Sequence, residues 1–269
     1  MRGQRPNARV FRGIAVAAAV TGSLATVWAV SVTPREVIAA EALAGSGFAV
    51  VEFFTSEGCS SCPPADEVLA ALDRHARKTG SPVYAVGYHV DYWDGLGWPD
   101  RFGDPAYSAR QRRYARALAS GRSYTPQAVV NGAVEFVGSD VRRMVDTVAA
   151  ALDATPAVTL TAAFDRADRQ KTWLRVDADG LEAGKDYVAT AVRTLRSATS
   201  AVDAGENRGR TLSHVNIVRE AVTAELNADG TATIALSRTA SDDDEEVVVW
   251  VSETAIGPIV AATRVDPRQ

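Results

Sequence analysis

The sequence predicts an α/β domain, in which helices flank a mixed sheet, followed by a mostly antiparallel, sandwich-like β module. Three observations support this prediction. A buried strand, a helix and a second strand follow one another between residues 48 and 90. An Asn-Gly turn at 131–132 separates two short strands. Beyond Pro156 the helical period fades, and alternation of apolar and polar residues replaces it.

The first predicted domain covers residues 46–155. Its opening strand, 48–54, is a short run of β-branched and aromatic residues. Apolar residues then recur at helical spacing up to Gly80, and 83–90 is the next strand, so a parallel β–α–β unit is expected. An inserted aromatic loop and a helix starting at Asp104-Pro105 precede the remaining elements, which are strands 127–130 and 134–137 and a helix near 141–152.

The second predicted module covers residues 156–269. Turn sequences such as Asp229-Gly230 separate its strands. These strands are expected at 158–164, 172–176, 187–192, 231–236, 247–251 and 259–263.

Residues 1–40 resemble an export segment. Four arginines precede an uncharged run from residue 13 to residue 32, which predicts either a cleaved signal peptide or an uncleaved N-terminal anchor. Either alternative implies an exported protein that is periplasmic, secreted or associated with the membrane through this segment. The net charge of −4 argues against a nucleic-acid partner, because binding to phosphates requires clustered Lys and Arg.

The chain has two cysteines, Cys59 and Cys62, three positions apart. A disulfide between them closes too small a loop to constrain the unfolded chain, so a stabilising cross-link is poorly supported. Chemistry or metal binding remains as the role of the pair. The pair precedes a helix, whose N-terminus stabilises a thiolate. We therefore expect Cys59 to be the exposed attacking thiol and Cys62, one turn further along, to be the resolving thiol.

Polar and aromatic residues follow the second predicted strand, at the sheet edge that carries the dithiol. His89 would lower a thiol pKa or move protons, and the tryptophans would form an apolar wall. The alternative is a packed loop with a hydrogen-bonded histidine. The candidate substrate-binding residues here are Asp91, Tyr92, Trp93 and Trp98. In the next helix, Arg110, Arg112, Arg113 and Arg116 are expected to form a solvated basic face.

Several stretches carry a resemblance to known proteins. The strand–CxxC–helix–strand order and the Thr-Pro pair at 125–126 resemble the thioredoxin superfamily. More closely, the chain is similar to a bacterial secreted family of thioredoxin-like proteins known as domain of unknown function 1223. The similarity extends from about residue 50 to the C-terminus, and it is carried by EFFTSEGCSSCPPAD, HVDYWDGLGWPDRF, RQRRYA, YTPQAVVNG and GENRGRTLSHVNIVR.

The resemblance to thioredoxins implies roles for particular residues. Pro126 would be cis and shape the groove beside the dithiol, and the backbone of Thr125 would pair with a substrate chain. Gln127, the next residue of the same loop, joins the candidate substrate-binding set. Glu52 would be a buried acid that moves the proton of Cys62, although a one-residue offset leaves an exposed strand carboxylate as the alternative.

The last of these stretches lies in the second module. Its polar residues either dock that module onto the first or cover the site, and the sequence leaves both alternatives open. They are Asn207, Arg208, Arg210, His214 and Asn216.

The leading hypothesis is an exported thioredoxin-like thiol–disulfide oxidoreductase that acts on protein or small-molecule disulfides. No cofactor is implied, because the sequence contains neither a GxGxxG fingerprint nor a phosphate-binding loop. The alternatives are an envelope protein that binds metal, such as copper, through the CxxC thiols, and a non-catalytic binding scaffold.

Overall fold

The structure is a computed structural model, and it describes residues 33–34, 38, 43, 45–118, 121–238 and 244–265. The predicted signal peptide or anchor at 1–40 therefore lies outside the described residues, apart from Thr33, Pro34 and Ile38. Within the described ranges, no helix has the length and apolar character needed to cross a membrane.

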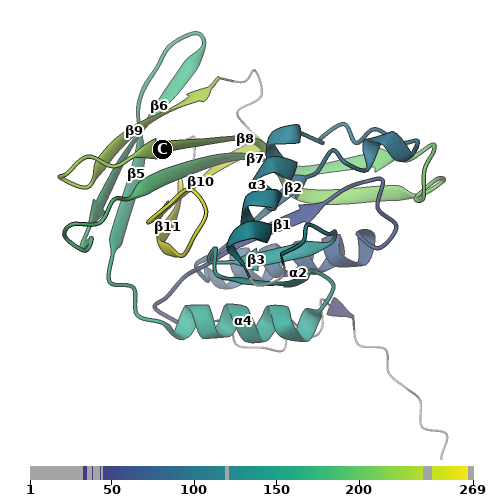
Figure 1. Cartoon of the computed structure of the whole chain (residues 1–269), viewed down its shortest axis with the longest axis horizontal. Helices are drawn as coiled ribbons and strands as arrows, with labels where there is room; N and C mark the ends of the chain where they lie inside the picture. Colours follow the sequence, from purple (N-terminus) through teal and green to yellow (C-terminus); the bar gives the residue numbers. More distant parts are fainter. Residues whose placement is uncertain are drawn as a thin grey trace, which may run out of the picture. The chain divides into compact units, whose positions relative to one another are not determined.

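The described part of the chain forms an eight-stranded mixed sheet and a three-stranded sheet (Figure 1). The large sheet has the order β11-β10-β7-β8-β2-β1-β3-β4. Within it, β1, β2 and β8 run parallel and the other neighbours are antiparallel. Its strands are β1 (Ala49–Thr55), β2 (Val83–His89), β3 (Gln127–Val130), β4 (Val134–Val137), β7 (Val188–Ala201), β8 (Thr211–Glu225), β10 (Glu245–Ser252) and β11 (Ile259–Val265).

Helices cover both faces of the large sheet. The helix α2 (Pro63–Thr79) and the helix α4 (Val141–Asp153) pack on the face that carries Val51 and Phe53 of β1. The helix α3 (Pro105–Ala117) packs on the opposite face, where Val50 and Phe54 point. Successive strand residues point to opposite faces, so β1 contributes to both cores. A short 3₁₀ helix, η1 (Asp94–Leu96), lies in the aromatic loop.

The small antiparallel sheet consists of β5 (Thr159–Ala167), β6 (Lys171–Asp179) and β9 (Thr231–Ser237). It shares a hydrophobic core with β7, β10 and β11, so this half of the protein consists of two layers of strands with the core between them. Val249 of β10 faces that core, whereas its neighbour Trp250 faces α3. The prediction of a mostly antiparallel, sandwich-like second half is confirmed.

The large sheet continues across the predicted module boundary at residue 156. The link is β8, which pairs with β2 at Gly87 and Ile217. No strand was expected at 211–225, because two inward-facing positions of β8 carry His214 and Asn216 instead of apolar residues. Polar residues at those positions hide the alternation that identifies a strand.

Candidate active site

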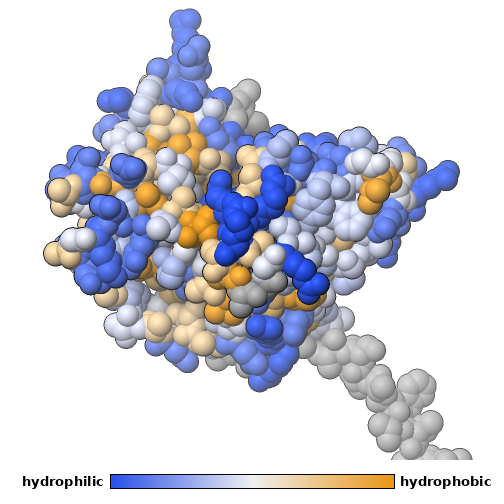
Figure 2. Space-filling model, viewed as in Figure 1, coloured by the Kyte–Doolittle hydropathy of each residue, from blue (hydrophilic) through white to orange (hydrophobic). Residues whose placement is uncertain are grey.

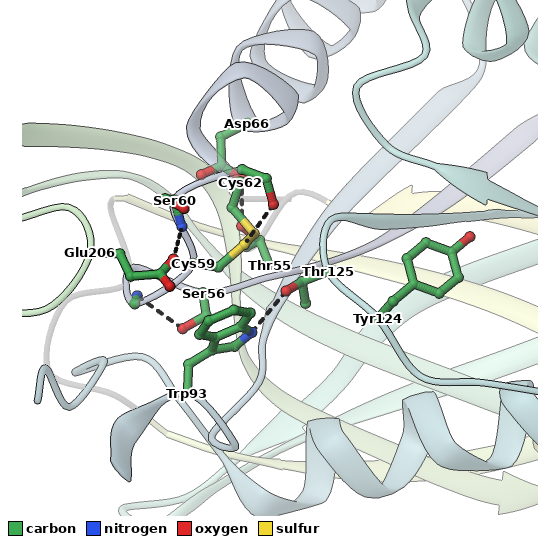
Figure 3. Close-up of a disulfide and its surroundings, with 12 residues drawn as sticks. Thr55, Ser56, Cys59, Ser60, Cys62, Asp66, Trp93, Tyr124, Thr125 and Glu206 are labelled. Atoms are coloured by element: carbon green, nitrogen blue, oxygen red, sulfur yellow. Dashed lines mark hydrogen bonds between the residues drawn. A yellow bond between two sulfur atoms is a disulfide. The ribbon is translucent and has the colours of Figure 1, made fainter. Parts of the chain in front are cut away.

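The cysteines lie where β1 leads into α2. Cys59 and Cys62 form a disulfide, and Cys62 is the N-cap residue of α2 (Figure 3). The connecting turn is held by the Cys62 N–H, which donates to the Cys59 carbonyl at 3.2 Å. Pro63 and Pro64 begin the helix, where a missing N–H leaves no lost partner. The strand–dithiol–helix arrangement expected from the sequence is therefore present.

Both cysteines are completely buried in this disulfide state. The expectation of an exposed Cys59 is therefore wrong, although Ser60 and Ser61 between the cysteines are exposed. Two segments pack against the dithiol loop. One is the aromatic loop, since a Cβ on Gly58 would lie 3.0 Å from the Trp93 Cβ. The other is formed by residues far along the chain.

Those residues belong to the hairpin tip, defined here as residues 202–210 between β7 and β8. The Asn207 amide Nδ2 donates to the carbonyls of Glu57 and Cys59, at 2.8 and 2.9 Å. The Glu206 carboxylate accepts a hydrogen bond from the Ser60 N–H at 3.0 Å, as Figure 3 shows. The sequence leaves open whether this stretch docks the second module or covers the site. Asn207 does the second, because its side chain binds the dithiol loop.

Asn216 serves the other alternative, which is docking. Its Nδ2 donates to the Ala85 carbonyl of β2 at 2.9 Å and to the Asp73 carboxylate of α2 at 2.8 Å. Its Oδ1 accepts a hydrogen bond from Arg77 at 3.2 Å. The strand β8 therefore docks the second half of the chain, and the hairpin tip that precedes it covers the dithiol loop.

A buried ionic cluster stands beside the dithiol loop. His214 of β8 lies between two carboxylates, with its Nε2 3.5 Å from Glu57 and its Nδ1 3.4 Å from Asp66. Asp66 is in the first turn of α2 and accepts a hydrogen bond from the Thr55 hydroxyl at 2.8 Å. Glu57, which is fully buried, comes from the CxxC loop itself.

His89 extends this cluster. Its Nδ1 is 2.7 Å from the Asp100 carboxylate, which also accepts the Glu57 N–H at 2.8 Å. The His89 and His214 rings meet edge to face, with centroids 4.7 Å apart. Thus the structure brings His89 to the cluster beside the dithiol loop, and its side chain is paired, as the alternative interpretation also expected.

The two carboxylates make His214 a strong base. Burial alone would lower the pKa of His214, but Asp66 and Glu57 outweigh it and raise that pKa to about 9. Burial would raise the pKa of Glu57, yet interactions with His214, Ser200 and Trp98 hold it below its ordinary value. The pKa of Asp100 is also lowered, because contacts with His89 and backbone N–H groups outweigh its burial. The cluster therefore holds an imidazolium between carboxylates at neutral pH.

The aromatic loop supplies two tryptophans that bind neighbouring polar groups. The Trp93 Nε1 donates to the Thr125 hydroxyl at 2.8 Å, and the Trp98 Nε1 donates to Glu57 at 2.7 Å. Tyr92 is 43% exposed. Asp91 is bound through its backbone and its carboxylate to the Ser108 hydroxyl of α3.

The Thr125–Pro126 peptide bond is cis. Gln127 follows at the start of β3, fully buried, and its side chain binds Gln111 and Glu135 at 3.0 Å each. The Gln127 side chain therefore belongs to an internal network.

Glu52 lies on the opposite face of the sheet from α2. It is fully buried and paired with Arg110, whose Nη2 is 2.9 Å from Oε1, so the alternative of an exposed carboxylate is wrong. Tyr114 also donates to this carboxylate. The one-residue offset from the thioredoxin pattern accounts for this placement, because adjacent strand residues point to opposite faces.

The same pair corrects the prediction for α3. Arg110 is only 5% exposed and does not belong to a solvated face. Arg112, Arg113 and Arg116 are exposed, and Figure 2 shows a strongly hydrophilic patch over α3. The solvated basic face therefore consists of three of the four arginines.

Sequence reasoning missed three acids of the site, Glu57, Asp66 and Asp100. Each lies inside a stretch that carries the family resemblance, which was the available indication. Asp66 was hidden because an acid in a first helical turn is ordinarily explained by the helix dipole. In the described part of the chain, no three His, Cys, Asp or Glu side chains are grouped so as to hold a metal ion.

Comparisons with known proteins give a family and a fold. The chain resembles protein AGR_C_4864 from Agrobacterium tumefaciens at 29% identity and a TM-score of 0.61, covering 82% of this chain and 94% of that one. It also resembles HBP35 of Porphyromonas gingivalis at 16% identity and a TM-score of 0.59, covering 84% and 77%. No curated protein matches the chain. The model of a protein family of unknown function, DUF1223, matches residues 50–252, so this chain belongs to the DUF1223 family.

Proposed function

We propose that this protein is an exported thiol–disulfide oxidoreductase built on a thioredoxin-like domain. The observation that carries the proposal is the Cys59–Cys62 disulfide at the N-cap of α2. These are the only cysteines in the sequence, and a three-residue separation makes them poor staples. A dithiol at a helix start, beside buried acids and histidines, is suited to exchange.

The thioredoxin-like assignment is supported by the order of the elements around the dithiol. β1, α2 and β2 form a parallel β–α–β unit, and β3 and β4 form a hairpin that adds to β1 on its other side. α4 then packs on the same face as α2. The aromatic loop and α3 are the inserted segment between β2 and β3.

The exchange proceeds in two steps. The Cys59 thiolate attacks one sulfur of a partner disulfide, which forms a mixed disulfide and releases one partner thiolate. The Cys62 thiol then loses its proton and attacks the Cys59 sulfur, which releases the second partner thiolate. Two electrons pass from the dithiol to the partner. The two partner thiolates take up two protons, one matching the proton lost by Cys62 and one from solvent, because Cys59 reacts as a thiolate. The reverse sequence oxidises a partner dithiol.

Asp66 is the proposed acceptor for the Cys62 proton. It lies four residues after Cys62, on the same face of the first turns of α2. Thr55 and His214 hold its carboxylate, and His214 in turn faces Glu57. A base inside the protein is needed because Cys62 has no exposed surface. Glu52 does not fit this role, because Arg110 and Tyr114 hold it on the other face of the sheet.

Export is supported by the sequence of residues 1–40, in which arginines precede a moderately apolar run. An oxidising compartment outside the cytoplasm suits a protein whose working group is a disulfide. The partners would be proteins or small molecules that carry a disulfide or a pair of thiols.

The reduction potential of the Cys59–Cys62 pair tests the proposal. Equilibration of the purified chain with the uncharged dithiothreitol couple should give one two-electron midpoint. Cys62→Ser should trap a mixed disulfide through Cys59 with a thiol reagent, whereas Cys59→Ser should trap none. Ser60→Ala is the matched control and should cycle. A pair that does not cycle with any dithiol would overturn the proposal.

A further inference from the structure

The hairpin tip reaches the dithiol loop from the second half of the chain, as His214 of β8 does. Its three hydrogen bonds, from Asn207 and Glu206, join residues about 150 positions apart in the sequence. The tip also abuts the aromatic loop, since a Cβ on Gly205 would lie 3.1 Å from the Trp98 Cβ and 3.8 Å from the Leu96 carbonyl oxygen. The tip is thus packed against both segments that flank Cys59.

This packing restricts access to the attacking sulfur. Cys59 is fully buried, so a partner sulfur reaches it only when a covering segment moves. The Ser60 N–H, in the residue next to Cys59, already donates to Glu206. A partner that displaces Glu206 therefore has to offer that N–H another acceptor, such as a peptide carbonyl.

Glu206 also places a negative charge at the entrance. Its carboxylate is exposed, and hydrogen bonds with the Ser60 side chain and the Ser60 N–H lower its pKa. Beside the tip, Leu96 of the aromatic loop is 60% exposed. The entrance thus combines an anion with an exposed apolar side chain, which suits a polypeptide better than a small anionic molecule.

We propose that the hairpin tip, through Glu206 and Asn207, determines which disulfides react with Cys59, admitting polypeptide disulfides and disfavouring small anionic ones. The inference rests on the proposed function and deepens it by naming the substrate class. Glu206 acts through charge and through its hold on Ser60. Asn207 is a positioning residue that holds the carbonyls of Glu57 and Cys59.

Rates of the reduced protein with two small disulfides test the role of the charge. Oxidised glutathione is anionic, and 2-hydroxyethyl disulfide is uncharged. Glu206→Gln should raise the rate with oxidised glutathione about threefold more than the rate with the uncharged disulfide, since one repulsive charge about 6 Å away in water is removed. Asp203→Asn removes an exposed charge of the same hairpin and should leave the ratio unchanged. An unchanged ratio in Glu206→Gln would overturn the inference.

A second pair of measurements tests the cover. Asn207→Ala should speed reduction of the Cys59–Cys62 disulfide by dithiothreitol about tenfold, while Arg208→Ala, at the exposed neighbouring position, should not. The wild-type protein should react at least about tenfold faster with a neutral cystine-bridged peptide than with oxidised glutathione. Equal rates with these two would refute the substrate class. If wild type exchanged with no disulfide, the proposed function itself would fail, whereas exchange insensitive to Glu206 and Asn207 would refute only this inference.

Discussion

Two buried ionic clusters lie near β1, and they differ in how completely their members are paired. On the α3 face, Arg110 makes two hydrogen bonds to Glu52, and Tyr114 adds a third. Beside the dithiol loop, His214 lies between Glu57 and Asp66 at 3.4–3.5 Å, and both of its ring nitrogens lack a hydrogen-bond partner in the described residues. The first arrangement is suited to stabilising the folded chain. The second, with longer distances between its members, is suited to proton transfer.

The comparison separates an ion pair suited to stabilising the fold from a cluster suited to the proposed exchange. Buried polar groups are normally hydrogen-bonded, so the two ring nitrogens of His214 that lack a hydrogen-bond partner need an explanation. The Glu52–Arg110 pair has the geometry of a structural ion pair, with bidentate contact. The His214 cluster has the burial and mutual charge that shift pKa values at functional sites. Four substitutions test this distinction, in order of decreasing expected effect.

Arg110→Met should have the largest effect on stability. It leaves the Glu52 carboxylate buried without its cation, which costs about 3–5 kcal/mol in the free energy of unfolding. Urea unfolding measures this loss. The double variant Glu52→Leu/Arg110→Met should recover most of it, because no charge is then left buried. A large change in reduction potential in the double variant would contradict a purely structural role.

His214→Gln should remove a pH dependence of stability. The folded pKa of His214, about 9, lies above its ordinary value of 6.5, so its stabilisation is complete below about pH 6.5 and is lost as the pH rises through about 9. Wild type should lose on the order of 2 kcal/mol across that window, and the variant should not. Unfolding by urea at a series of pH values measures this. A similar slope in both proteins would show that His214 does not carry the charge.

Asn216→Ala should cost about 2 kcal/mol, because it leaves the Ala85 carbonyl without its side-chain donor and removes one of the donors to the Asp73 carboxylate, which keeps Arg77. The Asn216 amide is hydrogen-bonded through both its oxygen and its nitrogen but is uncharged, so it adds a neutral example to the comparison of paired buried groups. Its φ of 47° also favours Asn over Ala. Asn216→Gly removes the amide without that backbone penalty, so its loss of thermal stability relative to wild type measures the hydrogen bonds. The further loss in Asn216→Ala measures the backbone penalty.

Trp98→Phe should have the smallest effect, about 1 kcal/mol, through loss of the hydrogen bond to Glu57. Without this donor the pKa of Glu57 should rise. The matched control is Trp93→Phe, which loses a bond to the neutral Thr125 hydroxyl. A shift in the pH dependence of thiol alkylation in the first variant alone would place Glu57 in the dithiol's electrostatic environment. Equal shifts would contradict this.

Much of the fold could be predicted from local patterns. The run of β-branched and aromatic residues in β1, the helical spacing in α2 and the Asn-Gly turn between β3 and β4 each depend on neighbouring residues. The strand β8 could not be predicted in this way. His214 and Asn216 occupy positions where a strand of the core would ordinarily carry apolar side chains, and their contacts explain the exception.

The site was predicted only in part, for a related reason. The position of Cys59 and Cys62 at the start of a helix could be predicted from the sequence, but the packing around them involves residues such as Asn207, far away in the sequence. Glu52 shows how strand register decides which face of the sheet a side chain occupies, since a shift of one residue places the side chain on the opposite face.

The late position of β8 in the chain has a consequence for synthesis. The dithiol emerges about 150 residues before Asn207, so every growing chain passes through a stage in which the CxxC is present and the hairpin tip is not. At that stage β2 is also an unpaired edge strand, because its partner β8 has not been made. A nascent or truncated chain ending before residue 188 lacks both the hairpin tip and β8. Its CxxC is therefore uncovered, and the free edge of β2 can pair with another chain. Such a chain is prone to non-native disulfides and to aggregation.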